Sequence, residues 1–460
     1  MTENNKKQKK ANMDELSESF VMRYGMTEID STYRMTLRYW RGDFYLWQEG
    51  VYGKLSKDEM RSFMVKHVLM NGCEATIGMM DNLKLNIMAR VILGNSRVPD
   101  TWIGKDGTEP AGEIVMKNGI LKVGADGTAE LKPLTPEFFT LGKLPYEYDP
   151  SAVCGLWDKV LKENTADDQL RRLLQQWAGY LLLPGQKYQS FMLLIGEAGT
   201  GKGTYARAMK AMLGKKNCSD IPLRRFTDKF SLYLTYGKKL NVAGDAEQEL
   251  TPQAEAVIKT WTGEDGLDFE KKYGEGFTAE PTAKLMILAN NFPTFTDKSM
   301  GTWRRLKIVP FARADTSVVD RNLDEKLEKE LPGILNWALE GLRDLQEHGS
   351  FATEGASEEM LEVYRAESNP ARMFLEEYCE YEHTYFPGVA AEQVYKAYSG
   401  WCRENGYQKM SSRTFGKEVR RAFPHIIRRR VGGKRDRYYA YGRLRLYNQR
   451  NDVKQWLKGR

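Results

Sequence analysis

The sequence predicts an α/β fold with a phosphate-binding-loop core, a helical collar before it and a winged-helix domain after it. Phe191–Ile195 is a continuous apolar run, typical of a buried parallel strand, and a glycine-rich segment follows it. Two later apolar runs, 239–244 and 285–289, each end in polar residues. Residues 409–460 hold 17 Lys and Arg against 3 Asp and Glu, in helical and strand-like patterns.

The glycine-rich segment, GEAGTGKGT, is expected to bind the phosphates of ATP. Its glycines let backbone N–H groups turn toward one anion, and the helix expected at 205–213 adds positive charge at its start. Lys202 can reach the β- and γ-phosphates. Gly203 stands where Ser or Thr normally binds Mg²⁺, and the hydroxyl comes one residue later, on Thr204. The expected nucleotide contacts are Gly196, Glu197, Ala198, Gly199, Thr200, Gly201, Lys202, Gly203 and Thr204.

Two carboxylates follow the strand expected at 239–244, in Asp245-Ala246-Glu247. A strand of this kind places an acid at its carboxyl end, beside the nucleotide. We therefore assign Asp245, with Thr204, to Mg²⁺ and Glu247 to polarising the attacking water. The alternative is that both are solvated loop acids.

Polar residues flank two further strands. Asn290 follows the strand expected at 285–289 and could orient the hydrolytic water or sense the γ-phosphate. Arg304 and Arg305 precede the strand expected at 308–311. Because arginine stays charged and binds phosphate oxygens with two N–H groups, these residues could serve a neighbouring subunit's nucleotide. An ordinary surface ion pair is the alternative.

Residues 266–272 and 277–282 are expected to form a hairpin, with Lys271 and Lys272 near its tip. Lysines on a projecting hairpin can hold DNA phosphates without reading sequence. Paired surface lysines are also common as merely solvated residues.

The basic C-terminal region is expected to form a winged helix that binds DNA. Val394, Tyr398 and Trp401 mark one helix, and Ser411 and Ser412 can cap a second. Strands expected at 426–430 and 437–441 flank a Gly-Gly turn, giving one helix for a groove and one wing for the backbone. A tail that serves only solubility is the alternative. The expected DNA contacts are Arg413, Lys417, Arg420, Arg421, Arg428, Arg429, Arg430, Lys434 and Arg435.

Other segments complete the predicted organisation. A hairpin is expected at 36–47, a helix at 57–69, and amphipathic helices at 170–181 and 331–342. Five widely spaced cysteines without a CxxC indicate reduced thiols and no zinc site. Without a long apolar run or a signal peptide, we expect a cytoplasmic protein with no membrane contact. The predicted divisions are a polar tail (1–15), an α+β region of unknown role (16–110), the collar (111–185), the ATPase core (186–346), a linker (347–369), the winged helix (370–447) and a basic tail (448–460).

Five ordered segments carry a resemblance to a known family. GEAGTGKGT, LNVAGDAEQE, GEDGLDFEKKYGE, LANNFPTFTD and GTWRRLKIVPF together resemble the superfamily 3 helicases, and more closely the phage and plasmid primase-helicases that include the poxvirus primase-helicase. The resemblance covers about residues 110–445. It implies an AAA+-type core that forms a ring, usually a hexamer, and moves 3′ to 5′ on single-stranded or forked DNA.

The resemblance also implies residue roles. Lys202 matches the phosphate-loop lysine, Asp245 and Glu247 the acidic pair, and Asn290 the sensor asparagine. Arg305 best matches the arginine finger, with Arg304 beside it, and Lys271 and Lys272 fall on the DNA-contacting hairpin.

The resemblance departs from the family pattern at Gly203 and at the N-terminus. About 100 residues precede the match, too few for a complete primase, so a separate primase or polymerase would act with the helicase. The expected function is ATP-dependent unwinding in the replication of a phage, plasmid or other mobile element. The alternatives are an ATPase that loads or remodels a partner protein, and an origin-binding initiator switched by ATP.

Overall fold

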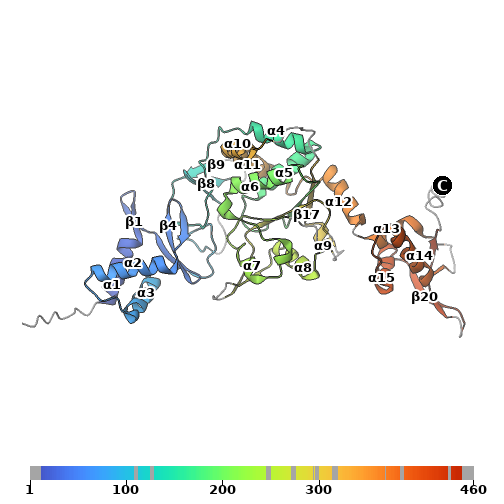
Figure 1. Ribbon diagram of the computed structural model, residues 1–460, viewed down its shortest axis with the longest axis horizontal. Coiled ribbons are helices and arrows are strands. Elements are labelled where there is room, and N and C mark those ends of the chain that lie inside the picture. The colour runs from blue at the N-terminus through green and yellow to red at the C-terminus, as the bar shows by residue number, and fades with distance from the viewer. Residues whose placement is uncertain are drawn as a thin grey trace, which may run out of the picture. The chain divides into compact units, whose positions relative to one another are not determined.

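The chain folds into two compact units, residues 1–357 and 358–460. The computed structural model describes residues 12–107, 112–124, 129–244, 250–270, 276–293, 295, 300–312, 320–367, 369–383, 388–433 and 437–447 (Figure 1). No helix within these ranges is long and apolar enough to cross a bilayer.

The N-terminal region combines three helices with small antiparallel sheets. The predicted hairpin at 36–47 is confirmed, and its two-residue turn, Arg41 and Gly42, has φ angles of 46° and 85°. Ser56 caps the second helix in a reciprocal pair with Glu59. The elements are α1 (Met13–Tyr24), β1 (Met26–Ile29), β2 (Thr32–Met35), β3 (Leu37–Trp40), β4 (Asp43–Gln48), β5 (Val51–Lys54), α2 (Lys57–Met70) and α3 (Ile77–Val91).

The segment expected to be a collar begins with strands and continues with helices. Trp157 on its first helix and Trp177 on its second are fully buried and share one hydrophobic core with the strand Phe191–Ile195 and with later helices. The expected boundary at 185 is therefore not a break in packing. The elements are β6 (Thr101–Trp102), β7 (Ile114–Met116), β8 (Gly119–Val123), β9 (Ala129–Lys132), β10 (Phe138–Phe139), α4 (Gly155–Asn164) and α5 (Asp168–Tyr180).

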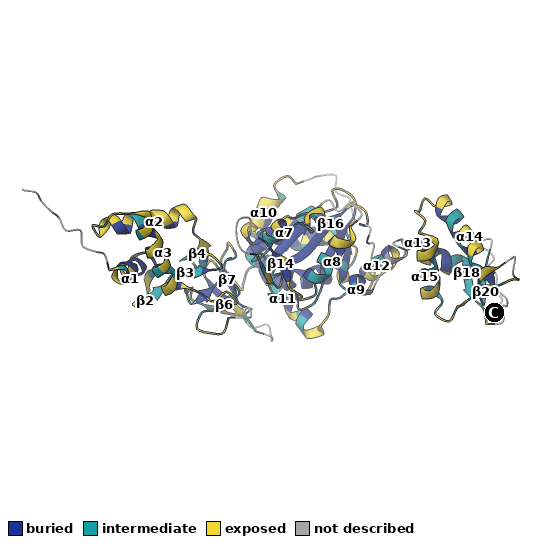
Figure 2. Ribbon diagram, turned by 90° about the horizontal axis from the view of Figure 1, so that it is seen from below, coloured by how far each residue is buried: buried dark blue, intermediate teal, exposed yellow. Residues whose placement is uncertain are grey.

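Five parallel strands form the central sheet, in the order β12-β13-β16-β11-β17. All four predicted core strands are present, and β16 is buried over nearly its whole length (Figure 2). The strands are β11 (Phe191–Ile195), β12 (Cys218–Ser219), β13 (Leu240–Ala243), β16 (Lys284–Ala289) and β17 (Leu306–Pro310). A separate hairpin pairs β14 (Leu267–Phe269) with β15 (Phe277–Ala279).

Helices cover this sheet and connect its strands. They are α6 (Lys202–Leu213), α7 (Lys229–Tyr233), α8 (Pro252–Trp261), α9 (Met300–Trp303), α10 (Leu323–Lys329) and α11 (Leu331–His348), with 3₁₀ turns at Lys215–Asn217 and Leu223–Arg225. Helix α12 (Ala356–Glu367) lies within the segment expected to be a linker, which is therefore largely helical.

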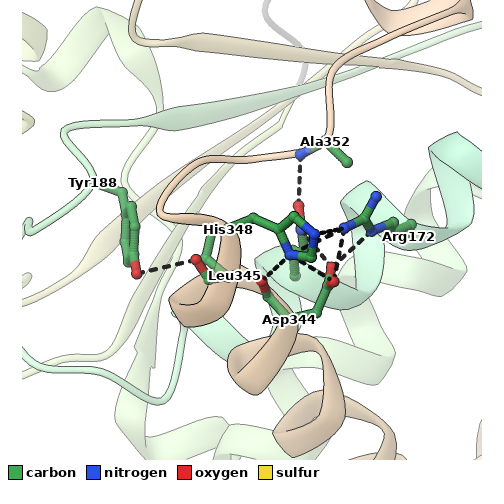
Figure 3. Close-up of polar contacts among 7 residues, drawn as sticks. Arg172, Tyr188, Asp344, Leu345, His348 and Ala352 are labelled. Carbon is green, nitrogen blue, oxygen red and sulfur yellow. Dashed lines mark hydrogen bonds and ion pairs between the residues drawn. The ribbon is translucent and has the colours of Figure 1, made fainter. Parts of the chain in front are cut away.

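Helices α5 and α11 match the two predicted amphipathic helices and pack directly on one another. Arg172 donates to Asp344 through Nε and Nη2 at 2.8 and 2.7 Å, and this contact lowers the pKa of the Asp344 carboxyl (Figure 3). Gln176 also donates to Asp344, and its amide oxygen accepts from the Ala352 backbone. Polar contacts thus fix the angle of two helices whose inner faces are apolar.

The second unit has the predicted winged-helix elements. Tyr398 stacks on Phe415 with ring centroids 4.4 Å apart, and Ser411 caps the second helix as expected. A three-stranded sheet has the order β19-β21-β20. The elements are α13 (Pro370–Tyr378), β18 (Cys379–Tyr381), β19 (Val389–Ala390), α14 (Ala391–Glu404), α15 (Ser412–Ala422), β20 (Ile427–Val431), β21 (Tyr438–Gly442) and β22 (Leu444–Leu446).

The α5–α11 contact requires glycine. A Cβ added at Gly341 would lie 2.1 Å from the Gln175 carbonyl oxygen, and one at Gly179 would lie 2.4 Å from the Leu342 nitrogen. We expect Gly341→Ala to lower the free energy of unfolding by about 1–3 kcal/mol or more, because backbone would have to move. Gly78→Ala, at an exposed position in the first turn of α3 with open space around it, is the matched control and should be neutral or slightly stabilising. Denaturant unfolding of the full chain measures both, and equal midpoints would contradict the contact.

Candidate active site

The predicted phosphate loop joins the carboxyl end of β11 to the start of α6. Gly199 and Gly201 have φ angles of 81° and 91°, which disfavour other residues. A Cβ on Gly196 would lie 2.4 Å from the Phe311 carbonyl oxygen, and one on Gly201 would lie 2.6 Å from Asn164 Oδ1. Thr200 Oγ1 donates to the Glu197 carbonyl at 2.8 Å and closes the loop. Phe311 and Asn164 therefore pack closely against the loop.

Lys202 is the first residue of α6, and its ammonium lies inside the loop. Nζ donates to the carbonyl oxygens of Gly196 and Glu197, the latter at 2.7 Å, and to Asn290 Oδ1 at 3.3 Å. The side chain is largely buried, and this burial lowers its pKa. A buried cation ringed by oxygen acceptors at a helix N-terminus is a favourable partner for phosphate.

Asn290 follows directly after β16, the strand that adjoins β11 in the sheet. Ile195 and Ala289 are paired in register, so the phosphate loop and Asn290 leave the sheet side by side. Strand β13 lies on the far side of β16, and Gly244 follows it. Asp245 and Glu247, predicted for Mg²⁺ and water, lie outside the described residues.

These segments line a cleft of about 770 Å³. This volume lies in the range of small-molecule sites. Gly199–Thr204 form one wall, and Leu156 and Val160 of α4 and Leu323 of α10 add apolar surface. Gly244 also lines the cleft, one residue before Asp245.

Several cleft residues were not predicted from the sequence. Asn164, Arg321 and Asp324 line it from segments that precede and follow the core motifs, and no local pattern marks them. Arg207 could have been found, because it lies on the helix that begins at Lys202. It forms an ion pair with Asp324 at 2.7 Å and donates to Thr204 Oγ1 at 3.3 Å.

The donors fit Mg²⁺ only in part within the described residues. Thr204 lines the cleft and offers one hydroxyl oxygen, while Gly203 offers no side chain. No group of three His, Cys, Asp or Glu residues suited to a metal occurs in the described ranges. The carboxylates of Asp320 and Asp324 also line the cleft, and each forms an ion pair with a basic side chain.

Arg304 and Arg305 lie at the opposite end of the sheet from the phosphate loop. Leu306, the first residue of β17, pairs with Phe191, the first residue of the parallel strand β11. Arg304 is exposed, whereas Arg305 is half-buried, and its Nη1 donates to the Gly301 carbonyl oxygen at 2.8 Å. Burial and the neighbouring Arg304 lower the pKa of Arg305. The structure therefore does not bring the two arginines to their own chain's cleft.

The two expected DNA-contacting regions are described to different extents. The β14–β15 hairpin is present, but Lys271 and Lys272 lie outside the described residues. On α15 all four predicted basic residues are exposed, and Arg421 also pairs with the buried Glu418 at 2.6 Å. These four residues are Arg413, Lys417, Arg420 and Arg421.

The wing strand β20 carries more positive charge. Arg428 and Arg430 are exposed, Arg429 is half-buried, and the Arg428 guanidinium lies 4.3 Å from the centre of the Tyr439 ring. Lys434 and Arg435 lie outside the described residues. Helix and wing together give the second unit a basic surface with exposed aromatic residues.

The fold and the loop define a P-loop-type α/β core joined to a winged-helix unit. Two family models match parts of the chain: a family of unknown function, DUF5906, over residues 194–305, and the RFX DNA-binding domain over residues 368–448. The first match contains the phosphate loop and both arginines, and the second contains the elements from α13 to β22.

Individual proteins extend these matches. The chain is 23% identical over 270 residues to a protein of Acanthamoeba polyphaga mimivirus named "Putative helicase L207/L206", covering 53% of this chain and 28% of that protein. It is 23% identical over 139 residues to the mitochondrial protein ymf21 of Marchantia polymorpha, covering 27% and 76%. The chain thus spans little more than a quarter of the mimivirus protein.

A solved structure shares the fold across nearly the whole chain. The apo structure of the NrS-1 C-terminal region superposes with a TM-score of 0.51 at 10% identity, covering 93% of this chain and 98% of that one. The chain therefore shares the architecture of that region and resembles a viral helicase-like protein in sequence.

The lowered pKa of Lys202 has a measurable consequence. Since the ammonium form binds phosphate, affinity for a non-hydrolysable ATP analogue should fall once the pH exceeds that pKa, by about tenfold for each further pH unit. The fall should begin below about pH 10.4, where an exposed lysine titrates. Calorimetric titrations between pH 7.5 and 10 test this, with adenosine as the phosphate-free control. Equal pH profiles for the two ligands would contradict the role of Lys202.

Proposed function

We propose that this protein is an ATP-dependent DNA helicase of the superfamily 3 type, acting in the replication of a mobile element. The observation that carries this is the meeting of Lys202 Nζ and Asn290 Oδ1, 3.3 Å apart, at the ends of neighbouring parallel strands. A phosphate-binding cation and a polar amide in one cleft are two of the groups that hold and cleave a γ-phosphate. The mimivirus relative's name agrees with this assignment.

The chain's own residues would divide the chemistry of hydrolysis. Lys202 and the loop N–H groups would hold the β- and γ-phosphates, whose oxygens would replace the carbonyls that Lys202 now contacts. Asn290 would orient the attacking water, and Glu247 would polarise it. Thr204 and Asp245 would hold Mg²⁺, which neutralises charge on the phosphates.

The position of the two arginines supports assembly of several subunits. Arg304 and Arg305 lie at the amino end of the sheet, which supports a role in completing the active site of a neighbouring subunit rather than their own. A closed ring, of which a hexamer is the expected form, repeats this contact around a central axis. The ring would move single-stranded DNA, 3′ to 5′, past Lys271 and Lys272.

The winged-helix unit would supply a second contact with DNA. Its basic helix and wing suit phosphate binding, and the RFX family match supports DNA as the partner. A separate primase or polymerase would complete replication. The predicted AAA+-type core, collar and domain boundaries belong to this proposal.

Replacing Lys202 tests whether the cleft is the site of ATP hydrolysis. Lys202→Ala should reduce ATP hydrolysis and strand displacement on forked DNA by at least about a hundredfold, because a phosphate contact made throughout the reaction is lost. Lys216→Ala, an exposed lysine just after α6, is the matched control and should keep both activities. Near-normal turnover by Lys202→Ala would contradict the assignment.

Two further results would favour the alternative functions. Stimulation of hydrolysis by a protein partner but not by DNA would favour a remodelling ATPase. A discrete DNA footprint that survives Lys202→Ala would favour an origin-binding initiator.

The role of the arginines is tested by mixing subunits. A chain with Arg304→Ala and Arg305→Ala should lose hydrolysis, yet mixing it with the Lys202→Ala chain should restore part of it, since some interfaces pair an intact loop with intact arginines. A chain that carries all three substitutions provides the control, because it should rescue neither variant. Steady-state hydrolysis across mixing ratios measures this, and absence of rescue at every ratio would refute the shared site.

A further inference from the structure

The N-terminal region, whose role the sequence does not indicate, is packed against the core through aromatic residues. Trp40 is buried, lies 5.3 Å from the Phe139 ring and stacks on Tyr236 of the core at 6.4 Å. Its indole nitrogen donates to the Arg97 carbonyl at 3.0 Å. Asp100 adds an ion pair to Lys239, next to β13, at 3.4 Å. The turn after Trp40 is thus held in a fixed place on the core.

Arg41 occupies that turn with a backbone conformation that arginine rarely adopts. Its φ of 46° belongs to the left-handed region, where two-residue turns of this kind favour Asn, Asp or Gly. No local feature of the hairpin calls for a long cationic side chain here. Contacts made by the guanidinium must therefore offset the backbone cost.

The Arg41 guanidinium lies among three aromatic rings. Its central carbon is 4.9 Å from the ring centre of Trp40, 4.9 Å from that of Tyr236 and 4.1 Å from that of Phe277. Nε donates to the Asn95 carbonyl at 3.3 Å, while the buried Nη1 has no hydrogen-bond partner among the described residues. Ring faces attract a cation, and they do so more strongly where water is partly excluded, so these three ring contacts stabilise the charge.

The nearest of these rings belongs to the root of the β14–β15 hairpin. Phe277 pairs in register with Phe269, and this is the last described pair before the hairpin loop. The two rings lie 5.6 Å apart, and Tyr236 contacts them at 5.2 and 4.9 Å. Lys229 of α7 adds an ion pair to Glu270 at 2.9 Å. The root of the hairpin is thus clamped between the core and Arg41.

We infer that Arg41 is a positioning residue through which the N-terminal region braces the β14–β15 hairpin. The consequence for DNA rests on the function proposed above: a hairpin that pulls a strand must transmit force to the core without bending at its root. Bracing the hairpin gives the N-terminal region a mechanical role. DNA-dependent hydrolysis should then depend on Arg41, whereas DNA-independent hydrolysis in the cleft, which Arg41 does not line, should not.

Hydrogen exchange tests the brace without requiring any activity. In the full chain, Arg41→Met should raise exchange about tenfold in residues 266–270 and 276–279, since the cation–π contacts of a half-buried guanidinium are lost. Arg41→Lys, which keeps the charge but not the planar group, should give a smaller rise. Arg61→Met on the exposed face of α2 is the matched control and should leave the hairpin unchanged. Unchanged exchange in the Arg41→Met hairpin, or an equal rise throughout α1, α2 and α3, would overturn the inference.

Hydrolysis tests the consequence for DNA. Arg41→Met should lower the ratio of hydrolysis with single-stranded DNA to hydrolysis without it several-fold, with the basal rate retained, and Arg41→Lys should restore part of that ratio. Equal loss of both rates would overturn the inference. A wild-type chain that DNA does not stimulate would refute the proposed function and this consequence together, while the exchange measurement would still decide whether Arg41 braces the hairpin.

Discussion

The Lys202 ammonium is a buried positive charge that must be surrounded by oxygen atoms, and the core is arranged around this requirement. Parallel strands bring the phosphate loop and Asn290 to the same edge of the sheet, and α6 begins at the lysine itself. The loop carbonyls and Asn290 Oδ1 supply the oxygens. Bulk cannot be added at Gly196 or Gly201 because Phe311 and Asn164 lie behind them. The cation, the glycines and the neighbouring segments therefore constrain one another.

The cleft and the two arginines lie at opposite edges of the same parallel sheet. Its carboxyl edge carries the cleft, and its amino edge carries Arg304 and Arg305, at the start of the strand that flanks β11. Under the proposed function, a single chain would hold halves of two different active sites, and contact between subunits would complete each of them. Arg41 adds a third connection, because it links the N-terminal region to the hairpin beside the core. Nucleotide, neighbouring subunit and DNA would then each contact a different part of the first unit.

The sequence predicted those features whose residues lie within one continuous segment. The phosphate loop, Asn290 and the basic helix each sit at the end of, or along, a pattern of apolar residues that a single segment can show. The cleft wall contributed by Asn164, Arg321 and Asp324 could not be predicted, because those residues come together only when α4 and α10 pack beside the loop. Arg41 was visible only as a hairpin turn. Its ring partners, Tyr236 and Phe277, lie far from it in the sequence, and no sequence pattern links them to Arg41.

Electron cryomicroscopy of the full chain with a non-hydrolysable ATP analogue and forked DNA tests the central claim most directly. The account requires a ring in which Lys202 Nζ lies within about 3 Å of a γ-phosphate oxygen. It also requires an arginine of the adjacent subunit to approach the same phosphate, and one DNA strand to occupy the pore. Monomers under these conditions, or nucleotide bound away from the β11–α6 loop, would contradict it.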